Sequence, residues 1–343
     1  MKKLLNTLFV TTQGAYLHKD GDTVEVSVNG EVKLKLPVHT LNSIVCFGNV
    51  ISSPFLIGMC AERGVNVAFL DEHGRFLYRA QGGISGNVLL RQEQYRRANT
   101  KLEATKIARN LLAGKIANMR MVLRRGLRDH PECDDDQAII TASRRLDHQL
   151  QGLRGIEDLD VLRGIEGDAS RLYFSLLDRL ITANKEKFFM KERTRRPPLD
   201  NLNALLSFIY TLLTHDAVGA CEGVGLDTQI GFLHAVRPGR PSLALDLIEE
   251  FRPVIADRLA LSLINLKQID PKGFKKTESG AVWMDDETRK TVLTAYQKRK
   301  QEEILHPYLQ EKAPIGILLH LQALLLARHL RGDIDAYPPF IWR

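Results

Sequence analysis

The sequence predicts an α+β protein, with an N-terminal β-sandwich-like domain over residues 1–85 and a larger all-α domain over 86–343. Three observations predict it. Apolar and polar residues alternate in the first 80 residues, which is the period of half-buried strands. The glycine-rich stretch "AQGGISGN" (80–87) then interrupts the pattern. From Val88 onward, apolar residues recur with the helical period.

A tight hairpin is the clearest element of the N-terminal domain. Alternating apolar residues occupy 24–28 and 32–36, on either side of Asn29-Gly30. Asn and Gly tolerate positive φ at both positions of a two-residue turn, so this pair predicts a hairpin. Further strands are expected at 5–10, 43–47, 65–70 and 75–79, and a short helix at 54–63.

The rest of the chain is predicted to be helical. The periodicity predicts helices over 88–126, 137–151, 163–183, 202–222, 242–266, 286–303 and 314–331. The segment 274–287 interrupts this pattern and predicts a loop or a small hairpin. The apolar run 315–327 is too short to span a bilayer, so we expect a buried helix there and no membrane segment.

The net charge and the spacing of the cysteines indicate the kind of partner and the cellular compartment. The chain has 343 residues and a formal net charge of +7. Residues 1–85 hold 8 Lys/Arg against 7 Asp/Glu, a net charge of +1, so the remaining 258 residues carry +6. A basic helical part indicates a polyanionic partner. The four cysteines are scattered, without a CxxC pair, which excludes a recognisable zinc site or disulfide framework and favours the cytoplasm.

The pentapeptide Leu-Arg-Gly-Ile-Glu occurs twice, ending at Glu157 and at Glu166. Nine residues separate the two glutamates, so one continuous helix would place them on opposite faces. Glu157 lies beside Asp158 and Asp160, which is typical of a turn or helix start. Glu166 has small neighbours that leave room for a ligand beside its carboxylate. The alternative is that Glu166 is a solvated surface charge.

A second cluster follows in "GLDTQIGFLHAVRPGRPSLALDLIEEFRP" (225–253). Ser242 is expected to cap a helix whose apolar stripe opposes Asp246, Glu249 and Glu250. Such a concentration of like charges, with His234 just upstream, suits Mn²⁺ or Mg²⁺, which prefer carboxylate oxygens and accept a single imidazole. A core histidine satisfied by a hydrogen bond is the alternative for His234. Any chemistry here would be metal-assisted.

Two basic stretches could contact a polyanion. "NKEKFFMKERTRRPP" (184–198) surrounds two phenylalanines with cations, as phosphate contacts and base stacking require. A solvated linker is the alternative. "RMVLRRGLR" (120–128) places arginines mostly on one side of a helix end, where they could equally be solvated or interact with the helix dipole.

Several segments of the sequence together resemble a known protein family. "LNSIVCFGN", "CAERGVNVAFLDEHGRFLYRAQGG", "LRGIEGDASRLYF", "NALLSFIYTLL" and the 225–253 segment resemble the CRISPR-associated endonuclease/integrase of spacer acquisition. The passage "HGRFLYRAQGG" is most similar to the type I-C branch. The resemblance covers nearly the whole chain in matching order. It implies an N-terminal β-sandwich domain for dimerisation and partner contacts, and a helical domain for catalysis and DNA binding.

The resemblance also implies a site and a reaction. Glu166, His234 and Glu249 would bind Mn²⁺ or Mg²⁺, and the catalytic residue Asp246 would lie close by as a supporting ligand. The 3′-hydroxyl of a foreign DNA fragment would attack a phosphodiester at the repeat border of a CRISPR array. The expected partners are double-stranded DNA (protospacer and repeat), a second copy of the chain in a homodimer, and a small ferredoxin-like adaptation protein in a heterohexamer.

We expect DNA contacts from two segments and one helix. The candidates are Lys191, Arg193, Arg195, Arg196, Arg237, Arg240 and Tyr210. Tyr210 and Asn203 on the helix 202–222 could line the site or touch DNA, and core packing is the alternative for both.

Two other functions stay open at this point. A general metal-dependent nuclease would use water as nucleophile, so it would act equally well on 3′-dideoxy ends. A non-enzymatic DNA-binding scaffold would keep all its activity after His234→Ala or Glu166→Ala.

Overall fold

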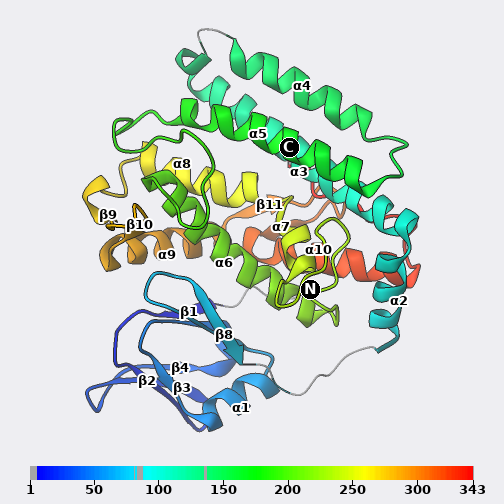
Figure 1. Cartoon of the computed structure of the whole chain (residues 1–343). Coiled ribbons are helices and arrows are strands. Elements are labelled where there is room, and N and C mark those ends of the chain that lie inside the picture. Colours follow the sequence, from blue (N-terminus) through cyan, green and yellow to red (C-terminus); the bar gives the residue numbers. More distant parts are fainter. Residues whose placement is uncertain (1–5, 81, 83–87, 135–136, 343) are drawn as a thin grey trace.

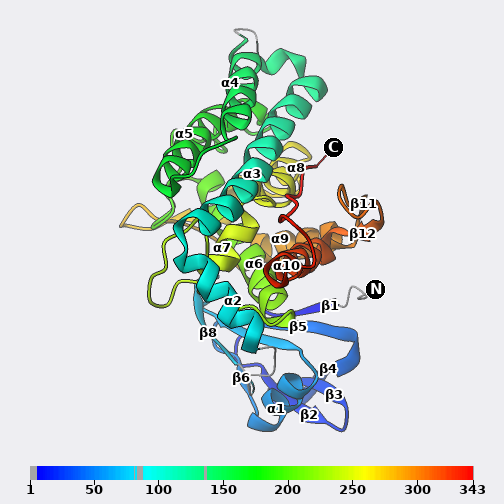
Figure 2. The same ribbon diagram turned by 90° about the vertical axis from the view of Figure 1, so that its right-hand side faces the viewer.

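The computed structural model describes residues 6–80, 82, 88–134 and 137–342. A strand-rich N-terminal part packs against one end of a larger helical part, as predicted (Figures 1 and 2). The predicted boundary at residue 85 lies outside the described residues.

The N-terminal domain is a sandwich of two sheets. One sheet has the order β1-β5-β7-β8 and the other β4-β3-β2-β6. Their bounds are β1 Asn6–Val10, β2 Tyr16–Asp20, β3 Thr23–Val28, β4 Glu31–Pro37, β5 Leu41–Phe47, β6 Ile51–Ser52, β7 Asn66–Leu70 and β8 Phe76–Ala80. Buried residues such as Leu17, Val24 and Ile44 form a core between the sheets with helix α1, Pro54–Glu62.

The predicted hairpin is confirmed by the pairing of β3 with β4. Asn29 has φ 53° and Gly30 has φ 81°, as a two-residue turn of this kind requires. Strand β2 was not predicted, because its sequence "YLHKD" has one buried position, Leu17, and no apolar alternation beyond it.

The helical domain contains most of the predicted helices. They are α2 Val88–Asn99, α3 Lys101–Asp129, α4 Ala138–Gly152, α5 Leu159–Leu177, α6 Asn201–Gly223, α7 Ser242–Ile248, α8 Arg258–Asn265, α9 Asp286–Gln301 and α10 Ile315–Arg331. The small hairpin allowed for 274–287 is present as β9 Phe274–Lys276 and β10 Val282–Met284. A second hairpin, β11 Glu303–Leu305 with β12 Lys312–Pro314, was missed, so the domain is helical with two short hairpins.

Two predicted helices are each divided. The segment 88–126 breaks at Thr100 into α2 and α3. The segment 242–266 was wrong as one helix, because a π-helical turn, Arg252–Asp257, separates α7 from α8. Pro253 lies in this turn and has no N–H for the helical ladder, which accounts for the irregularity.

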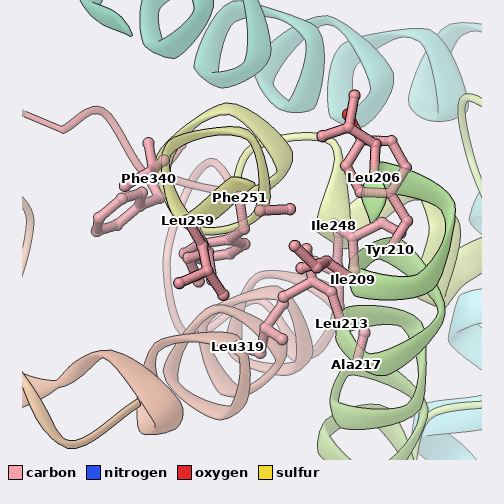
Figure 3. Packing of buried hydrophobic residues seen from close by; sticks show 14 of the residues in the cluster. Leu206, Ile209, Tyr210, Leu213, Ala217, Ile248, Phe251, Leu259, Leu319 and Phe340 are labelled. Atoms are coloured by element: carbon pink, nitrogen blue, oxygen red, sulfur yellow. The ribbon is translucent and has the colours of Figure 1, made fainter. Parts of the chain in front are cut away.

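Helix α6 is the central helix of the domain. By length and composition it is the helix in the described ranges that could cross a membrane, but 61% of its most apolar window is buried inside the protein. Figure 3 shows Ile209 and Leu213 of α6 beside Ile248, with Phe251 close by. Thus α6 is a core helix, and it supports the segment that follows α7.

The two domains share a packed interface. Phe47 and Leu70 from the β1-β5-β7-β8 sheet belong to the same buried cluster as the helices. The rings of Phe47 and Phe208 lie 6.0 Å apart, and His73 stacks on Trp283 at 4.5 Å. The sheet thus packs along α6, from Phe208 to Gly219.

Candidate active site

Four side chains from three helices and one loop meet in the helical domain. Glu166 comes from α5, His234 from the loop before α7, Glu249 from the end of α7, and Lys115 from α3. The Lys115 ammonium contacts Glu166 and lies 2.5 Å from Oε2 of Glu249. Nε2 of His234 lies 3.7 Å from Oε1 of Glu249. The three predicted metal ligands therefore converge, although 83 residues separate the first from the last in the chain.

Asp246 holds His234 in one orientation. Oδ1 accepts hydrogen bonds from the backbone N–H of His234 at 2.9 Å and from Nδ1 at 2.6 Å. Oδ2 accepts the backbone N–H groups of Phe232 at 2.5 Å and Leu233 at 3.0 Å. With Nδ1 donating to a carboxylate, Nε2 is the ring nitrogen with a lone pair, and it faces Glu249.

These bonds also define what Asp246 itself can do. A carboxylate has about four lone-pair positions, and four donors already occupy them here. Asp246 is buried with none of its surface exposed. It therefore positions the imidazole and the loop, and its oxygens are already occupied, which does not favour the role of supporting ligand predicted for it.

The loop reaches this position because Gly231 has no side chain. A Cβ at Gly231 would lie 2.7 Å from Oδ2 of Asp246 and against Ser242. Nε of Arg163 donates to the carbonyl of Leu233 at 2.8 Å and ties the loop to α5. The hydroxyl of Ser242 donates to the carbonyl of Ala235 at 3.1 Å. Ser242 therefore anchors the loop, and the prediction that it caps α7 was wrong, because α7 begins at Ser242 after Pro241.

Glu249 is ionised in this environment. It is 1% exposed, and burial alone would raise the pKa of its carboxyl. The Arg252 guanidinium, which contacts Oε1, and the Lys115 ammonium outweigh burial and lower the pKa of Glu249 well below its usual range. Glu249 is a permanent negative charge at neutral pH.

Glu166 is the accessible member of the set. Its side chain is 30% exposed and accepts a hydrogen bond from Ser170 at 2.8 Å. A Cβ added at Gly164 or at Gly167 would meet nothing within 4 Å. Because its side chain is partly exposed, a ligand can approach Glu166.

Glu250 does not belong to the site. Its carboxylate accepts hydrogen bonds from Gln322, Tyr337 and the N–H of Phe340, and burial raises its pKa to about 8. The three acids predicted on one helix face therefore diverge. Asp246 and Glu249 turn toward His234, and Glu250 turns toward the C-terminal segment.

The donor set suits a divalent cation in its chemistry but not in its present spacing. Within the described ranges, no three His, Cys, Asp or Glu side chains are already spaced as metal ligands, because Lys115 lies between the carboxylates. The donors themselves are suitable: two carboxylates and one Nε2 lone pair, with a carboxylate behind the imidazole, are a shell for Mn²⁺ or Mg²⁺. The residues fit the ion once the ammonium moves aside.

Lys115 is the site residue that the sequence reasoning missed. It is 3% exposed and lies in the apolar stretch "LLAGKIANM" of α3. A single lysine between buried aliphatic residues almost always has a buried counter-charge. That signal was available in the sequence, but it does not say which carboxylate is the partner.

Several predicted DNA contacts are accessible to solvent. Lys191, Arg195, Arg196 and Arg237 are exposed and Arg240 is half-buried. Burial, Arg237, Arg252 and Arg196 all lower the pKa of Arg240, so these guanidiniums are neighbours. Within the described ranges, no carboxylate lies at ion-pair distance from any of the five residues. We name these five residues the loop cations.

Arg193 and Tyr210 lie inside instead. Arg193 donates to Asn203 at 2.7 Å and its guanidinium lies 5.3 Å from the Tyr210 ring. The Tyr210 hydroxyl donates to the buried Asp257 at 2.6 Å, and Tyr210 is 8% exposed. Asn203 is fully buried. Their positions favour the packing alternative for Tyr210 and Asn203 and make Arg193 a structural arginine.

Glu157 has no part in the site. It is exposed and precedes Asp158, whose side chain accepts the N–H groups of Asp160 at 2.8 Å and Val161 at 3.3 Å. Asp158 thereby caps α5, as the acidic cluster of a helix start predicted. Of the two repeated pentapeptides, only the second places its glutamate among catalytic candidates.

The chain is similar to several known proteins. The family model described as "CRISPR associated protein Cas1" matches residues 8–298. CRISPR-associated endonuclease Cas1 1 of Chlorobaculum tepidum is 55% identical over 343 residues, and that of Moorella thermoacetica 51%, each covering 100% of both chains.

Solved structures share the fold. A casposase bound to its integration product has a TM-score of 0.85 at 22% identity and covers 99% of this chain and 95% of its own. A CAS1 protein from Thermotoga maritima has a TM-score of 0.81 at 24% identity and covers 96% and 97%. A Cas6-RT-Cas1–Cas2 complex matches 100% of this chain and 36% of the other, with a TM-score of 0.82 at 20% identity.

Proposed function

This chain belongs to the Cas1 family of CRISPR-associated proteins, and from that premise we propose that it is a divalent-metal-dependent DNA endonuclease and integrase of CRISPR adaptation. The observation that carries the proposal is that Glu166 and Glu249 meet at the Lys115 ammonium, with Nε2 of His234 3.7 Å from Glu249. Residues far apart in the chain meet there, and they are the donors that Mn²⁺ or Mg²⁺ requires.

The proposed reaction is a transesterification. The 3′-hydroxyl oxygen of a DNA fragment forms a new bond to phosphorus at the repeat border, and the bond from that phosphorus to the 3′-oxygen of the target strand breaks. The proton lost by the attacking hydroxyl balances the one gained by the released hydroxyl. One phosphodiester replaces another, so the reaction needs no nucleotide cofactor. With water as the attacking oxygen, the same site would act as an endonuclease, which is the name that the curated relatives carry.

The cation, when bound, neutralises phosphate oxygens and activates the attacking oxygen. Glu166, Nε2 of His234 and Glu249 would hold it. Asp246 keeps Nδ1 of His234 protonated, so that Nε2 is free to bind. Arg252 holds Glu249 in the ionised state and in a fixed place.

The loop cations supply the contacts to double-stranded DNA in this proposal. Arg196, Arg237 and Arg240 lie on the side of Arg252, next to Glu249, so a bound backbone would pass the site. Phosphate contacts of this kind give affinity without sequence preference. The structural neighbours include a casposase bound to an integration product and a TtCas1–DNA complex, which agrees with a DNA substrate.

The proposed assembly is a homodimer bound to a small ferredoxin-like adaptation protein in a heterohexamer. Exposed apolar residues lie on the N-terminal domain, among them Phe55 at 79%, Phe76 at 45% and Tyr78 at 55% exposure. Such a concentration of apolar surface is typical of a protein interface. Solved neighbours include complexes of Cas1 with Cas2, which supports a Cas partner. The type I-C assignment and a cytoplasmic location are part of the same proposal.

Strand joining tests the function. The purified chain, with its ferredoxin-like partner, is incubated with Mn²⁺, a labelled duplex and a plasmid that carries CRISPR repeats. We expect joining that requires a free 3′-hydroxyl and that His234→Ala abolishes. If 3′-dideoxy duplexes react equally well, the chain is a nuclease and not an integrase. If Glu166→Ala and His234→Ala leave every activity intact, the scaffold alternative replaces the proposal.

A further inference from the structure

Lys115 joins the two carboxylates that the proposed function assigns to a cation. Its ammonium contacts Glu166 of α5 and lies 2.5 Å from Glu249 at the end of α7. The side chain is 3% exposed, and Leu111, Leu112 and Ile116 around it on α3 are fully buried. In Figure 2, α3 passes directly beside α5 and α7. The ammonium thus comes from the helix that runs along both carboxylate-bearing elements.

The backbone is arranged to bring this lysine close. A Cβ at Gly114 would lie 3.0 Å from the side chain of Glu250, which is tighter than most packed contacts. The glycine therefore allows α3 to approach the segment that carries Glu249. An ammonium buried to this degree is costly unless carboxylates surround it, and here two do.

Two protein cations offset the charges of the two carboxylates. Glu166 and Glu249 supply two negative charges, and Lys115 and Arg252 supply two positive ones. A dication that approaches this set meets repulsion from both cations as well as attraction from both carboxylates. Lys115 contacts Oε1 of Glu166 and Oε2 of Glu249, so an ion that binds both carboxylates through these oxygens competes with the ammonium.

We propose that Lys115 is a positioning residue that holds Glu166 and Glu249 together in the cation-free chain and lowers the affinity of the site for a divalent cation. The inference rests on the proposed function, because it takes these carboxylates to be cation ligands. In the absence of a divalent cation, the ammonium prevents the buried Glu249 and its neighbour Glu166 from repelling each other. When a cation binds, the ammonium leaves at least one carboxylate oxygen. The loss of that ion pair weakens binding.

The experiment compares Lys115→Met and Lys115→Gln with Lys300→Met. Lys300 is a second buried lysine, 4% exposed, which pairs with Asp216 at 2.8 Å on the far side of α6 from the site. The full-length variants are measured in two ways. Melting temperature in EDTA reports the cation-free chain, and calorimetric titration with MnCl₂ at constant pH reports cation affinity. Gln can hydrogen-bond one carboxylate, so it keeps the test valid if the Met variant does not fold.

All three variants are expected to melt at lower temperature than the parent in EDTA, since each leaves a carboxylate that is wholly or largely shielded from solvent with fewer partners. Only the Lys115 variants are expected to bind Mn²⁺ more tightly, by at least about tenfold, because a nearby positive charge is gone. Lys300→Met is expected to bind Mn²⁺ like the parent.

Two results overturn the inference and differ in what they say of the function. If the parent binds Mn²⁺ and the Lys115 variants bind it equally or more weakly, Lys115 does not compete with the cation, and the proposed function stands. If neither the parent nor the Lys115 variants bind Mn²⁺, both the inference and the metal-dependent function are wrong.

Discussion

The charged side chains around Glu249 and the loop cations lie next to each other, but they differ in burial and in ion pairing. Inside, Glu249 and Lys115 are buried, Arg252 is 13% exposed, and each contacts an opposite charge. Outside, Arg196 and Arg237 are exposed and, in the described ranges, have no carboxylate at ion-pair distance. A buried charge without a partner is costly, whereas a solvated one is not. This contrast shows that the charges around Glu249 fix the geometry of the site, whereas the loop cations are available to bind a polyanion.

Neutralising Glu249 is expected to have the largest effect on stability and on strand joining. Glu249→Gln leaves Lys115 and Arg252 with one carboxylate between them, so we expect a loss of about 3 to 5 kcal/mol in the free energy of unfolding. Strand joining should fall below detection. Urea denaturation and the joining assay measure the two effects. Glu157→Gln is the control, since Glu157 is exposed and distant from the site. A Glu249→Gln protein as stable and active as the control would contradict the claim that the charges around Glu249 fix the geometry of the site.

Removing the orienting carboxylate is expected to cost less. Asp246→Asn cannot accept all four donors, so the tautomer and position of His234 are no longer fixed. We expect about a 10- to 100-fold loss of Mn²⁺ affinity with the fold retained. Calorimetric titration measures the affinity, and circular dichroism checks the fold. Unchanged affinity would show that Asp246 does not act through the imidazole.

Substitutions of the loop cations are expected to change DNA binding alone. Arg196→Ala, Arg237→Ala and Arg240→Ala should each weaken duplex binding several-fold and reduce the salt dependence of log K by about one. Thermal stability should not change. The matched control is Arg145→Ala, an exposed arginine of α4 that already pairs with Asp168 at 2.8 Å. Equal losses in the control and the loop variants would mean that the loop cations are not a distinct surface.

His215 on α6 differs from both sets of charges, because its side chain is kept neutral. Burial lowers its pKa from 6.5 to about 4. The unfolded chain therefore binds the proton first, and stability is lost as pH falls from about 6.5 toward 4. Between pH 7 and 5.5 the loss from this group is about 1 kcal/mol. His215→Gln should reduce the slope of stability against pH in that range. A slope equal to that of the parent would show that His215 titrates normally.

Much of the fold could be predicted because each domain follows one period. The alternation on either side of Asn29-Gly30 and the helical repeats beyond Val88 were sufficient for the architecture. Strand β2 was missed because its ends are polar, and β11 and β12 because three-residue strands carry no periodic signal. The break after α7 depended on Pro253, whose effect the apolar stripe concealed.

The site was predictable in its members but not in its arrangement. Composition and resemblance pointed to Glu166, His234 and Glu249. That Asp246 would be saturated by three backbone N–H groups and Nδ1, and that Glu250 would face the C-terminal segment, depends on tertiary packing. The partners of Lys115 lie 51 and 134 residues away in the chain, so no local pattern could identify them. Arg193 and Tyr210 looked like surface candidates because buried cation–ring contacts have no sequence signature.

The central claim is that Glu166, His234 and Glu249 together bind one divalent cation. It is tested most directly by counting Mn²⁺ per chain in calorimetric titrations of the parent and of His234→Asn, a variant of a partly exposed side chain that removes Nε2 and leaves the inner ion pairs in place. The account predicts one Mn²⁺ per parent chain and at least about a tenfold loss of affinity in the variant. Undiminished binding by His234→Asn would contradict it.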